Sequence, residues 1–284
     1  MDINVTCVYN NNLRQGDGFG AFNGVAFLVE TNKSKIMFDL GLVCWRLIRN
    51  LRILDINPNS IDKVTISHGH MDHVRGIIAL LKTRTIGEKI PIYGHPNIIE
   101  PKKACLYGLR LWNAGFPKMT PEMTNQLNFT FNRDVFEVEP NVFLSGEIPL
   151  EERKAERHLS KYFWHEVNGK WEHDPMIDEQ FLVLKTKEGL AVISGCCHTG
   201  ISNAINKISE RFNDEIHTFI GGIHMIKSEK KKIIRLAQTI QQDFSHIKFY
   251  LNHSTGIRTM KYLEKRLGKE TINRFHVGSK LVFS

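Results

Sequence analysis

The most constraining feature of this chain is a dense group of histidines between a strand-like and a helix-like segment. Residues 63–67 read Lys-Val-Thr-Ile-Ser, a β-branched run typical of a strand, and residues 68–73 read His-Gly-His-Met-Asp-His. Residues 74–81 have the apolar spacing of a helix that packs on a sheet. The group therefore lies at the carboxyl end of a strand and the amino end of a helix, where ligand sites are common in layered α/β proteins.

The spacing of these side chains indicates a metal site. Histidines at i and i+2 in an extended segment project to the same side, so His68 and His70 face one point in space. Asp72 and His73 follow where the next element begins, and they can face a neighbouring point. Three imidazoles and one carboxylate within six positions thus predict donors for two cations side by side.

Other strand-like segments lead to histidines in the same way. The apolar runs at 190–194, 217–220 and 248–251 are followed by His198, His224 and His253, each near a small residue and the start of a predicted helix. Chance clustering is the alternative in a chain with thirteen histidines, but it does not explain this repetition. We expect several loops to converge on one edge of a sheet sandwich.

These motifs resemble a known family. His-x-His-x-Asp-His after a hydrophobic strand is the signature of the metallo-β-lactamase fold superfamily. Residues 189–201, 219–224 and 251–256 are similar to the GC-x-H-x-G-I, GG-x-H and H-C-T-G motifs of one branch. That branch includes archaeal dihydropterin–ribofuranosylaminobenzene phosphate synthases and bacterial proteins described as metal-dependent hydrolases. The likeness runs from about Asn23 to the C-terminus.

The resemblance implies an α/β fold, an αββα four-layer sandwich with two mixed β-sheets packed face to face and helices outside. We expect one metallo-β-lactamase-like domain over residues 1–284. Residues from about 95 to 175 are rich in aromatics, interrupted by prolines and weakly periodic, although residues 135–145 alternate like a strand. This composition favours an insertion that covers the active site. An irregular part of the core and an oligomer contact are the alternatives.

The motifs and the resemblance together supply a set of candidate metal ligands. They are His68, His70, Asp72, His73, His198 and His253. Mixed imidazole and carboxylate donors suit one or two divalent cations, with zinc expected first and manganese or iron as alternatives.

Three further residues are candidates for the site. Asp39 closes an apolar strand, and the resemblance places such an acid behind the ligands, where it orients a histidine; capping the next helix is the alternative. Cys196 stands where most of the superfamily has a metal-bridging aspartate. Its thiolate could bind metal, but we favour packing as a small hydrophobe, which would weaken or abolish the second metal site. Asp178 precedes the strand where the superfamily usually carries its third histidine, and it is a ligand, a supporting acid or a cap.

The predicted substrate is a small anionic or phosphorylated molecule. Gly221 and Gly222 would let backbone N–H groups approach an anion closely, with a tight turn as the alternative. The formal net charge of +8 suits such a substrate. The lysines at 230–232 fit the solvated face of an amphipathic helix, so we expect no nucleic-acid partner. His224 is expected to face the pocket without binding metal, and to stabilise charge or donate a proton.

These features predict a metal-dependent hydrolase in which Asp72 orients a metal-activated water. A transferase like the dihydropterin synthases, releasing pyrophosphate, is the first alternative, and a non-hydrolytic iron or redox protein is the next. A nuclease that acts on RNA ranks last. The N-terminus lacks a secretory pattern, no run is apolar enough to span a bilayer, and the cysteine count of five is odd. We therefore expect a cytoplasmic protein without a membrane partner, and a homo-oligomer stays open.

Overall fold

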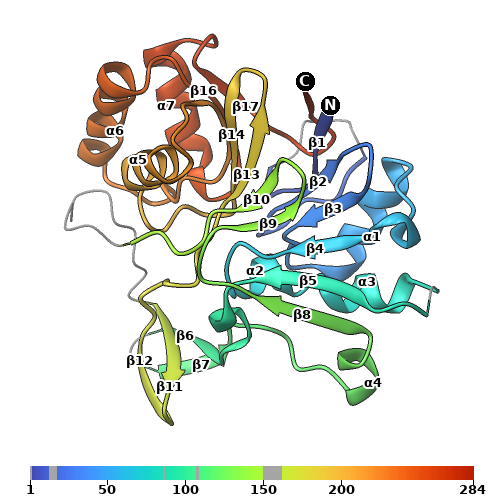
Figure 1. The fold of residues 1–284 in the computed structure, drawn as a ribbon. Helices are drawn as coiled ribbons and strands as arrows, with labels where there is room; N and C mark the ends of the chain where they lie inside the picture. The colour runs from blue at the N-terminus through green and yellow to red at the C-terminus, as the bar shows by residue number, and fades with distance from the viewer. Residues whose placement is uncertain (1, 13–17, 86, 107–108, 150–161) are drawn as a thin grey trace.

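The computed structural model describes residues 2–12, 18–85, 87–106, 109–149 and 162–284. Within these ranges the strands form two seven-stranded sheets and one four-stranded sheet (Figure 1). The first sheet runs in the order β18 (Lys280–Phe283), β1 (Ile3–Tyr9), β2 (Ala26–Glu30), β3 (Lys35–Phe38), β4 (Lys63–Thr65), β5 (Ile90–Gly94) and β8 (Leu127–Phe131). The second runs in the order β17 (Ile272–Arg274), β16 (Lys248–Leu251), β15 (Ile216–Gly221), β14 (Gly189–Ser194), β13 (Leu182–Thr186), β10 (Val142–Leu144) and β9 (Phe136–Glu139).

Both large sheets are mixed. In the first sheet β3, β4, β5 and β8 are parallel neighbours, and β18, β1, β2 and β3 pair antiparallel. In the second sheet β14, β15, β16 and β17 are parallel, and β9, β10, β13 and β14 pair antiparallel. Because parallel strands all end at the same edge, the loops after β3 and β4 and those after β14, β15 and β16 are brought within reach of one another.

The two large sheets pack face to face, as the alternation of side chains along β2 and β14 shows. Phe27 of β2 contributes to one buried cluster together with Ala191 and Ile193 of β14, so this cluster lies between the sheets. The opposite face of β2, with Leu28, joins a second cluster that includes helix residues. The opposite face of β14, with Val192, joins a third. A strand buried on both faces needs apolar residues at every position, which explains its continuous apolar sequence.

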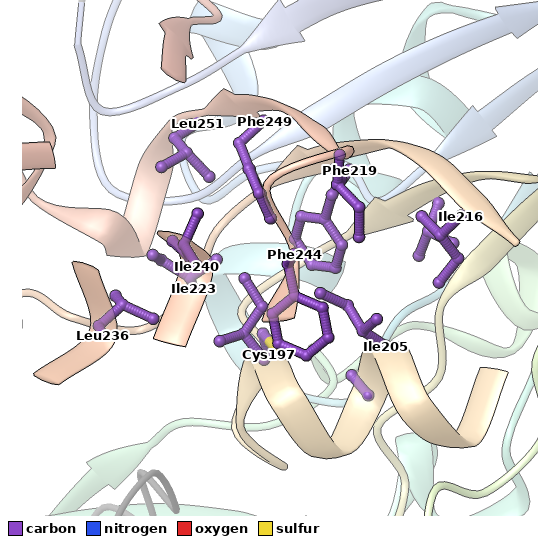
Figure 2. Close-up of a cluster of buried hydrophobic side chains, with 14 of the residues drawn as sticks. Cys197, Ile205, Ile216, Phe219, Ile223, Leu236, Ile240, Phe244, Phe249 and Leu251 are labelled. Carbon is purple, nitrogen blue, oxygen red and sulfur yellow. The ribbon is translucent and has the colours of Figure 1, made fainter. Parts of the chain in front are cut away.

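Helices cover the outer face of each large sheet. The elements are α1 (Cys44–Ile53), α2 (Met71–Val74), α3 (Ile77–Thr83), α4 (Pro121–Thr124), α5 (Ile201–Phe212), α6 (Lys230–Asp243) and α7 (Ile257–Leu267), with short 3₁₀ turns η1 (Pro58–Ser60), η2 (Pro96–Ile99) and η3 (His253–Thr255). Figure 2 shows Ile205 of α5 and Ile240 of α6 packed against Phe219 and Phe249 of the second sheet. On the first sheet, Leu47 of α1 belongs to the corresponding outer cluster. The four layers are therefore helix, sheet, sheet and helix, which confirms the predicted αββα sandwich.

The four-stranded sheet corrects the predicted insertion. Its order is β12 (Lys170–His173), β11 (Phe163–Val167), β6 (Lys102–Leu106) and β7 (Leu109–Asn113). The chain between β7 and β11 returns to the core, where β8 extends the first sheet and β9 and β10 extend the second. The stretch from 95 to 175 is thus two excursions that pair with each other, rather than one continuous insertion. Parts of it at 107–108 and 150–161 lie outside the described residues.

The predicted strand over residues 135–145 is also corrected. It is a hairpin of β9 and β10, in which Asn141 turns the chain with a φ of 70°. Asparagine tolerates this left-handed conformation because its short polar side chain bonds locally. Organisation as a single domain stays a prediction. Among the helices of the described ranges, none has the length and apolar character needed to cross a bilayer.

The contact between the two large sheets should dominate stability. Leu184 of β13 is fully buried in the cluster between the sheets, and Leu184→Ala should lower the free energy of unfolding by about 2–5 kcal/mol through lost burial and a cavity. The control is Val282→Ala at a position that is 61% exposed, which should change stability by about 0.5 kcal/mol or less. Urea denaturation measures both. A loss below about 1 kcal/mol for Leu184→Ala would contradict the packing described here.

Candidate metal centre

Three histidines from two distant loops form the first group of donors. His68 and His70 follow β4, and His198 follows β14. The Nε2 of His68 lies 3.1 Å from the Nδ1 of His70 and 3.3 Å from the Nε2 of His198. All three side chains are buried, and His70 and His198 also line a pocket.

The spacing of these nitrogens fits a cation. Ligand nitrogens in a tetrahedral zinc site lie about 2.0–2.1 Å from the metal, which puts neighbouring nitrogens about 3.3 Å apart. The distances from His68 to His70 and to His198 are close to this value. Lone pairs that converge in a buried space repel one another unless a proton or a cation lies between them. The first group therefore has the donor chemistry and the spacing of a metal site.

A second group lies beside the first. The Nε2 of His73 is 3.7 Å from Oδ1 of Asp72, and the Nε2 of His253 is 3.7 Å from Oδ2 of the same carboxylate. The sulfur of Cys196 lies between the two rings, 3.3 Å from Nε2 of His73 and 3.2 Å from Nε2 of His253. Asp72, His73 and His253 form one set of convergent donors, and His68, His73 and Cys196 form another that joins the two groups.

The orientation of Cys196 argues against the packing role that we favoured. Its sulfur points at two imidazole nitrogens instead of into an apolar cluster. The neighbouring Cys197 takes the packing role, since its side chain is fully buried among the residues of the outer cluster on the second sheet, as Figure 2 shows. Burial raises the pKa of the Cys196 thiol, and a cation at this position would reverse that effect by stabilising the thiolate.

One buried acid orients histidines of both groups. Oδ2 of Asp39 accepts a hydrogen bond from Nδ1 of His73 at 2.7 Å and from Oγ of Ser67 at 2.7 Å. The Ser67 hydroxyl in turn lies 2.9 Å from Nδ1 of His68. Both rings are thereby held with Nε2 toward the metal centre. This is the orienting role predicted for Asp39, and the capping alternative does not hold because the residue that caps α1 is Val43.

Two asparagines that sequence reasoning missed complete this support. Nδ1 of His253 bonds Oδ1 of Asn11 at 2.8 Å, and Nδ2 of Asn23 donates to Oδ2 of Asp72 at 3.0 Å. Both lie near the ends of the Asn- and Gly-rich loop between β1 and β2. No spacing in the sequence connects that loop with residues 72 or 253, so only the fold reveals the contacts.

Asp178 and Glu179, which precede β13, accept hydrogen bonds from the two loops that carry the first donor group. Oδ2 of Asp178 accepts the backbone N–H of Gly69 at 2.7 Å. The two carboxylate oxygens of Glu179 accept the backbone N–H groups of His198 and Thr199, at 2.7 and 2.8 Å. Burial raises the pKa of Glu179 to about 7 in spite of these donors. Asp178 is in none of the convergent donor sets among the described residues, so its place is that of a supporting acid. Glu179 was missed, although its position beside Asp178 was a signal.

Electrostatics keep the imidazoles of His68 and His253 neutral. Burial, followed by the charge of His73, lowers the pKa of His68 well below its ordinary value and lowers the pKa of His253 to about 3. Both rings are therefore neutral at pH 7, which is the state that binds a metal. Burial acts to raise the pKa of Asp72, but the surrounding histidines, His73 first, outweigh it and bring the pKa below its ordinary value. Asp72 is accordingly ionised at neutral pH.

The metal centre opens into a pocket of about 710 Å³. Asp72, Cys196, His198 and His253 line its floor, and His224 lines its wall with its ring 4.3 Å from that of His198. None of the convergent donor sets in the described part of the chain contains His224. His224 therefore faces the pocket, and its role there stays a prediction.

Aromatic and basic residues form the mouth of this pocket. Trp112, Tyr162 and Phe163 come from the small sheet and its approach, and Phe163 stacks on the ring of His70 at a centroid distance of 4.2 Å. Lys227 and Lys232 lie near the start of α6 and are exposed. The small sheet thus contributes to the lining of the pocket, and a covering role stays a prediction.

Gly221 and Gly222 do not have the predicted substrate contact. Both are buried, and neither lines the pocket. A Cβ at Gly221, where φ is +117°, would lie 2.1 Å from the carbonyl oxygen of Ser194, and one at Gly222 would lie 2.3 Å from Oγ of Ser254. The glycines are required because two loops pass very close together behind the site. The turn alternative therefore holds.

Comparison with known proteins assigns the class. The family model of the metallo-beta-lactamase superfamily matches residues 19–195, more than half of the chain. The chain belongs to this superfamily, as its motifs and its fold indicate.

Individual relatives are similar to nearly the whole chain. The 7,8-dihydropterin-6-methyl-4-(beta-D-ribofuranosyl)-aminobenzene-5'-phosphate synthase of Methanocaldococcus jannaschii is 29% identical over 273 residues, which cover 93% of this chain and 91% of that protein. The crystal structure of Tm1679, described as a metal-dependent hydrolase of the beta-lactamase superfamily, is 27% identical, with a TM-score of 0.79 over 98% of each chain. YhfI from Bacillus subtilis has the same fold at 13% identity, with a TM-score of 0.59 over 99% of each chain.

Removing one histidine of the first group should remove a cation. We expect His68→Ala to bind about one equivalent less zinc than the unchanged protein in equilibrium dialysis. The reason is that the variant lacks the Nε2 that lies beside the donor nitrogens of His70 and His198. His246→Ala is the matched control, since His246 is exposed and its loss should leave the stoichiometry unchanged. Equal zinc content in the two variants would contradict the assignment of the metal centre.

Proposed function

We propose that the protein is a metal-dependent hydrolase that acts on a small anionic substrate. The observation that carries the proposal is the pair of neighbouring donor groups beside the large pocket, with the Asp72 carboxylate both in one donor group and in the lining of the pocket. Zinc fits the imidazole-rich donor set best, and manganese or iron would also accept it. When bound, a divalent cation supplies Lewis acidity, which lowers the pKa of a water and polarises a substrate oxygen.

The chain's own residues supply the proton transfers. Asp72 is ionised at neutral pH and lines the pocket, so it can accept the proton of the attacking water. Asn23 holds the carboxylate in place by its hydrogen bond to Oδ2. Water adds to the ester, amide or phosphoryl centre, the bond to the leaving group breaks, and His224 donates a proton to that group from the pocket wall.

The mouth of the pocket supports the choice of substrate. Lys227 and Lys232 place positive charge in the lining of the pocket, and ammonium groups attract phosphate or carboxylate. Trp112 and Phe163 offer faces on which a flat apolar group can lie. A small molecule with both a ring and an anionic group matches this surface.

A transferase is the second candidate. The synthase from Methanocaldococcus jannaschii aligns with nearly the whole chain, and the aromatic wall of the pocket would suit a ring substrate in either reaction. In transfer, an amine acceptor would replace water as the nucleophile and pyrophosphate would be the leaving group. The same metal centre would serve.

Asp72 should be essential for turnover. We expect Asp72→Ala to lower the hydrolysis rate of a chromogenic phosphodiester or ester by about 100-fold or more, because the proton acceptor is lost. The loss of folding stability should be much smaller, since the side chain lies at the pocket. Asp243→Ala is the control, because Asp243 is exposed at the end of α6. Full activity of Asp72→Ala with intact metal content would refute the assigned role.

Hydrolysis and transfer can be separated by acceptor dependence. Zinc-loaded protein is incubated with a hydroxymethyl-dihydropterin pyrophosphate, with and without an aminobenzene acceptor, and pyrophosphate is measured. The hydrolase proposal predicts that release does not depend on the acceptor. Release only when the acceptor is present would overturn it in favour of the transferase.

A further inference from the structure

Lys102 is a buried cation that the proposed chemistry does not use. The residue is only 2% exposed, although it belongs to the small sheet at the pocket mouth. Its Nζ lies 2.6 Å from Oδ2 of Asp174 and 3.1 Å from the carboxylate of Asp178. Burial opposes the charged form, but Asp178 and Asp174 raise the pKa of Lys102 above its ordinary value. Taking three charges out of water is costly, and an apolar cluster of the same volume would often be as stable.

The two acids connect this lysine to the His-Gly-His turn. Asp178 accepts the backbone N–H of Gly69, as described above, and Oδ2 of Asp174 lies 3.4 Å from Nε2 of His70. That Nε2 is buried, and among the residues that the structure describes it makes no hydrogen bond of good geometry beyond this contact. The carboxylate of Asp174 is therefore the charged group that faces the rear nitrogen of a candidate metal ligand.

The backbone makes a parallel connection. The N–H of Met71 donates to the carbonyl of Ala114 at 2.7 Å, and the N–H of Ala114 donates to the carbonyl of Lys102 at 2.9 Å. A Cβ at Gly69 would lie 2.4 Å from the carbonyl oxygen of Ile98. The His-Gly-His turn therefore packs between η2 on one side and the small sheet on the other.

The charges favour one tautomer of His70. One ammonium against two carboxylates leaves a net negative charge behind the ring. A carboxylate at Nε2 holds the ring proton there and leaves the lone pair on Nδ1, the atom that faces Nε2 of His68. Asp174 can do this only while it is itself held in position, and the short contact with Lys102 holds it.

We propose that Lys102 and Asp174 are positioning residues for the cation of the first donor group. Through them the small sheet supports the metal centre as well as forming the pocket wall. The inference rests on the binding of a cation by His68, His70 and His198, and it is independent of whether the reaction is hydrolysis or transfer.

Stepwise metal affinity tests the proposal without an activity assay. Zinc dissociation constants are measured by competition with a chromophoric chelator, and Co²⁺ absorption reports the ligand field. We expect Lys102→Met and Asp174→Asn each to weaken one of the two binding steps by about 10–100-fold and to change the Co²⁺ spectrum. The weakened step should be the one that His198→Ala abolishes, because His198 belongs to the first group.

Lys63→Met is the matched control. Lys63 makes an ion pair with Glu139 at 2.9 Å at the far end of β4, away from the turn. The loss of Lys63 should lower stability but leave both zinc dissociation constants within about twofold and the Co²⁺ spectrum unchanged. If Lys102 had a purely structural role, Lys102→Met would give this same result. Asp174→Asn has the shape of the original side chain, so it tests the proposal if Lys102→Met does not fold.

The outcomes separate this inference from the proposed function. If the unchanged protein binds no zinc, the metal centre and the proposed function fail together with it. If the unchanged protein binds zinc and Asp174→Asn binds it equally tightly with the same Co²⁺ spectrum, only the positioning role is overturned. Selective weakening of the step that His198→Ala abolishes supports it.

Discussion

The candidate metal centre depends on the convergence of buried nitrogen lone pairs. Nitrogens of the buried side chains of His68, His70 and His198 lie 3.1 and 3.3 Å apart. Protonation would relieve their repulsion in solution, but burial opposes it, as the lowered pKa of His68 shows. A divalent cation is the occupant that satisfies all of the lone pairs at once. The hydrogen bonds that Asp39 and Glu179 make behind the site then have a common purpose, since they hold the donors in place before a cation arrives.

The sandwich explains how such distant residues meet. Parallel strands of both sheets end at one edge, so that the loop after β4 lies opposite the loop after β14, with the loop after β16 beside them. The apolar contact between the sheets fixes this arrangement, and the outer helices bury the remaining faces. Supporting residues come from the loop after β1, the acidic pair before β13 and the small sheet. The metal centre is therefore a product of long-range packing, although each ligand sits in a local motif.

The sequence revealed most of what is local and little of what is long-range. The fold and the histidines could be predicted because strands with continuous apolar residues end in motifs that the superfamily shares. The orientation of Cys196 could not be predicted from the sequence. The alternation of side chains stops where β14 ends, and the neighbouring Cys197 is chemically identical. The role of Gly221 cannot be read from the sequence, because a close backbone approach and an anion site require the same residue. The pairing of Lys102 with Asp174 joins two segments separated by three core strands, and no periodicity links them.

Anomalous diffraction from crystals grown with zinc, recorded on both sides of the zinc absorption edge, tests the central claim most directly. We expect a peak in contact with Nε2 of His68, Nδ1 of His70 and Nε2 of His198, and a second peak near Asp72, His73 and His253 is compatible with the two donor groups. A map with no peak at the three histidines, or with zinc bound only at surface residues, would contradict it.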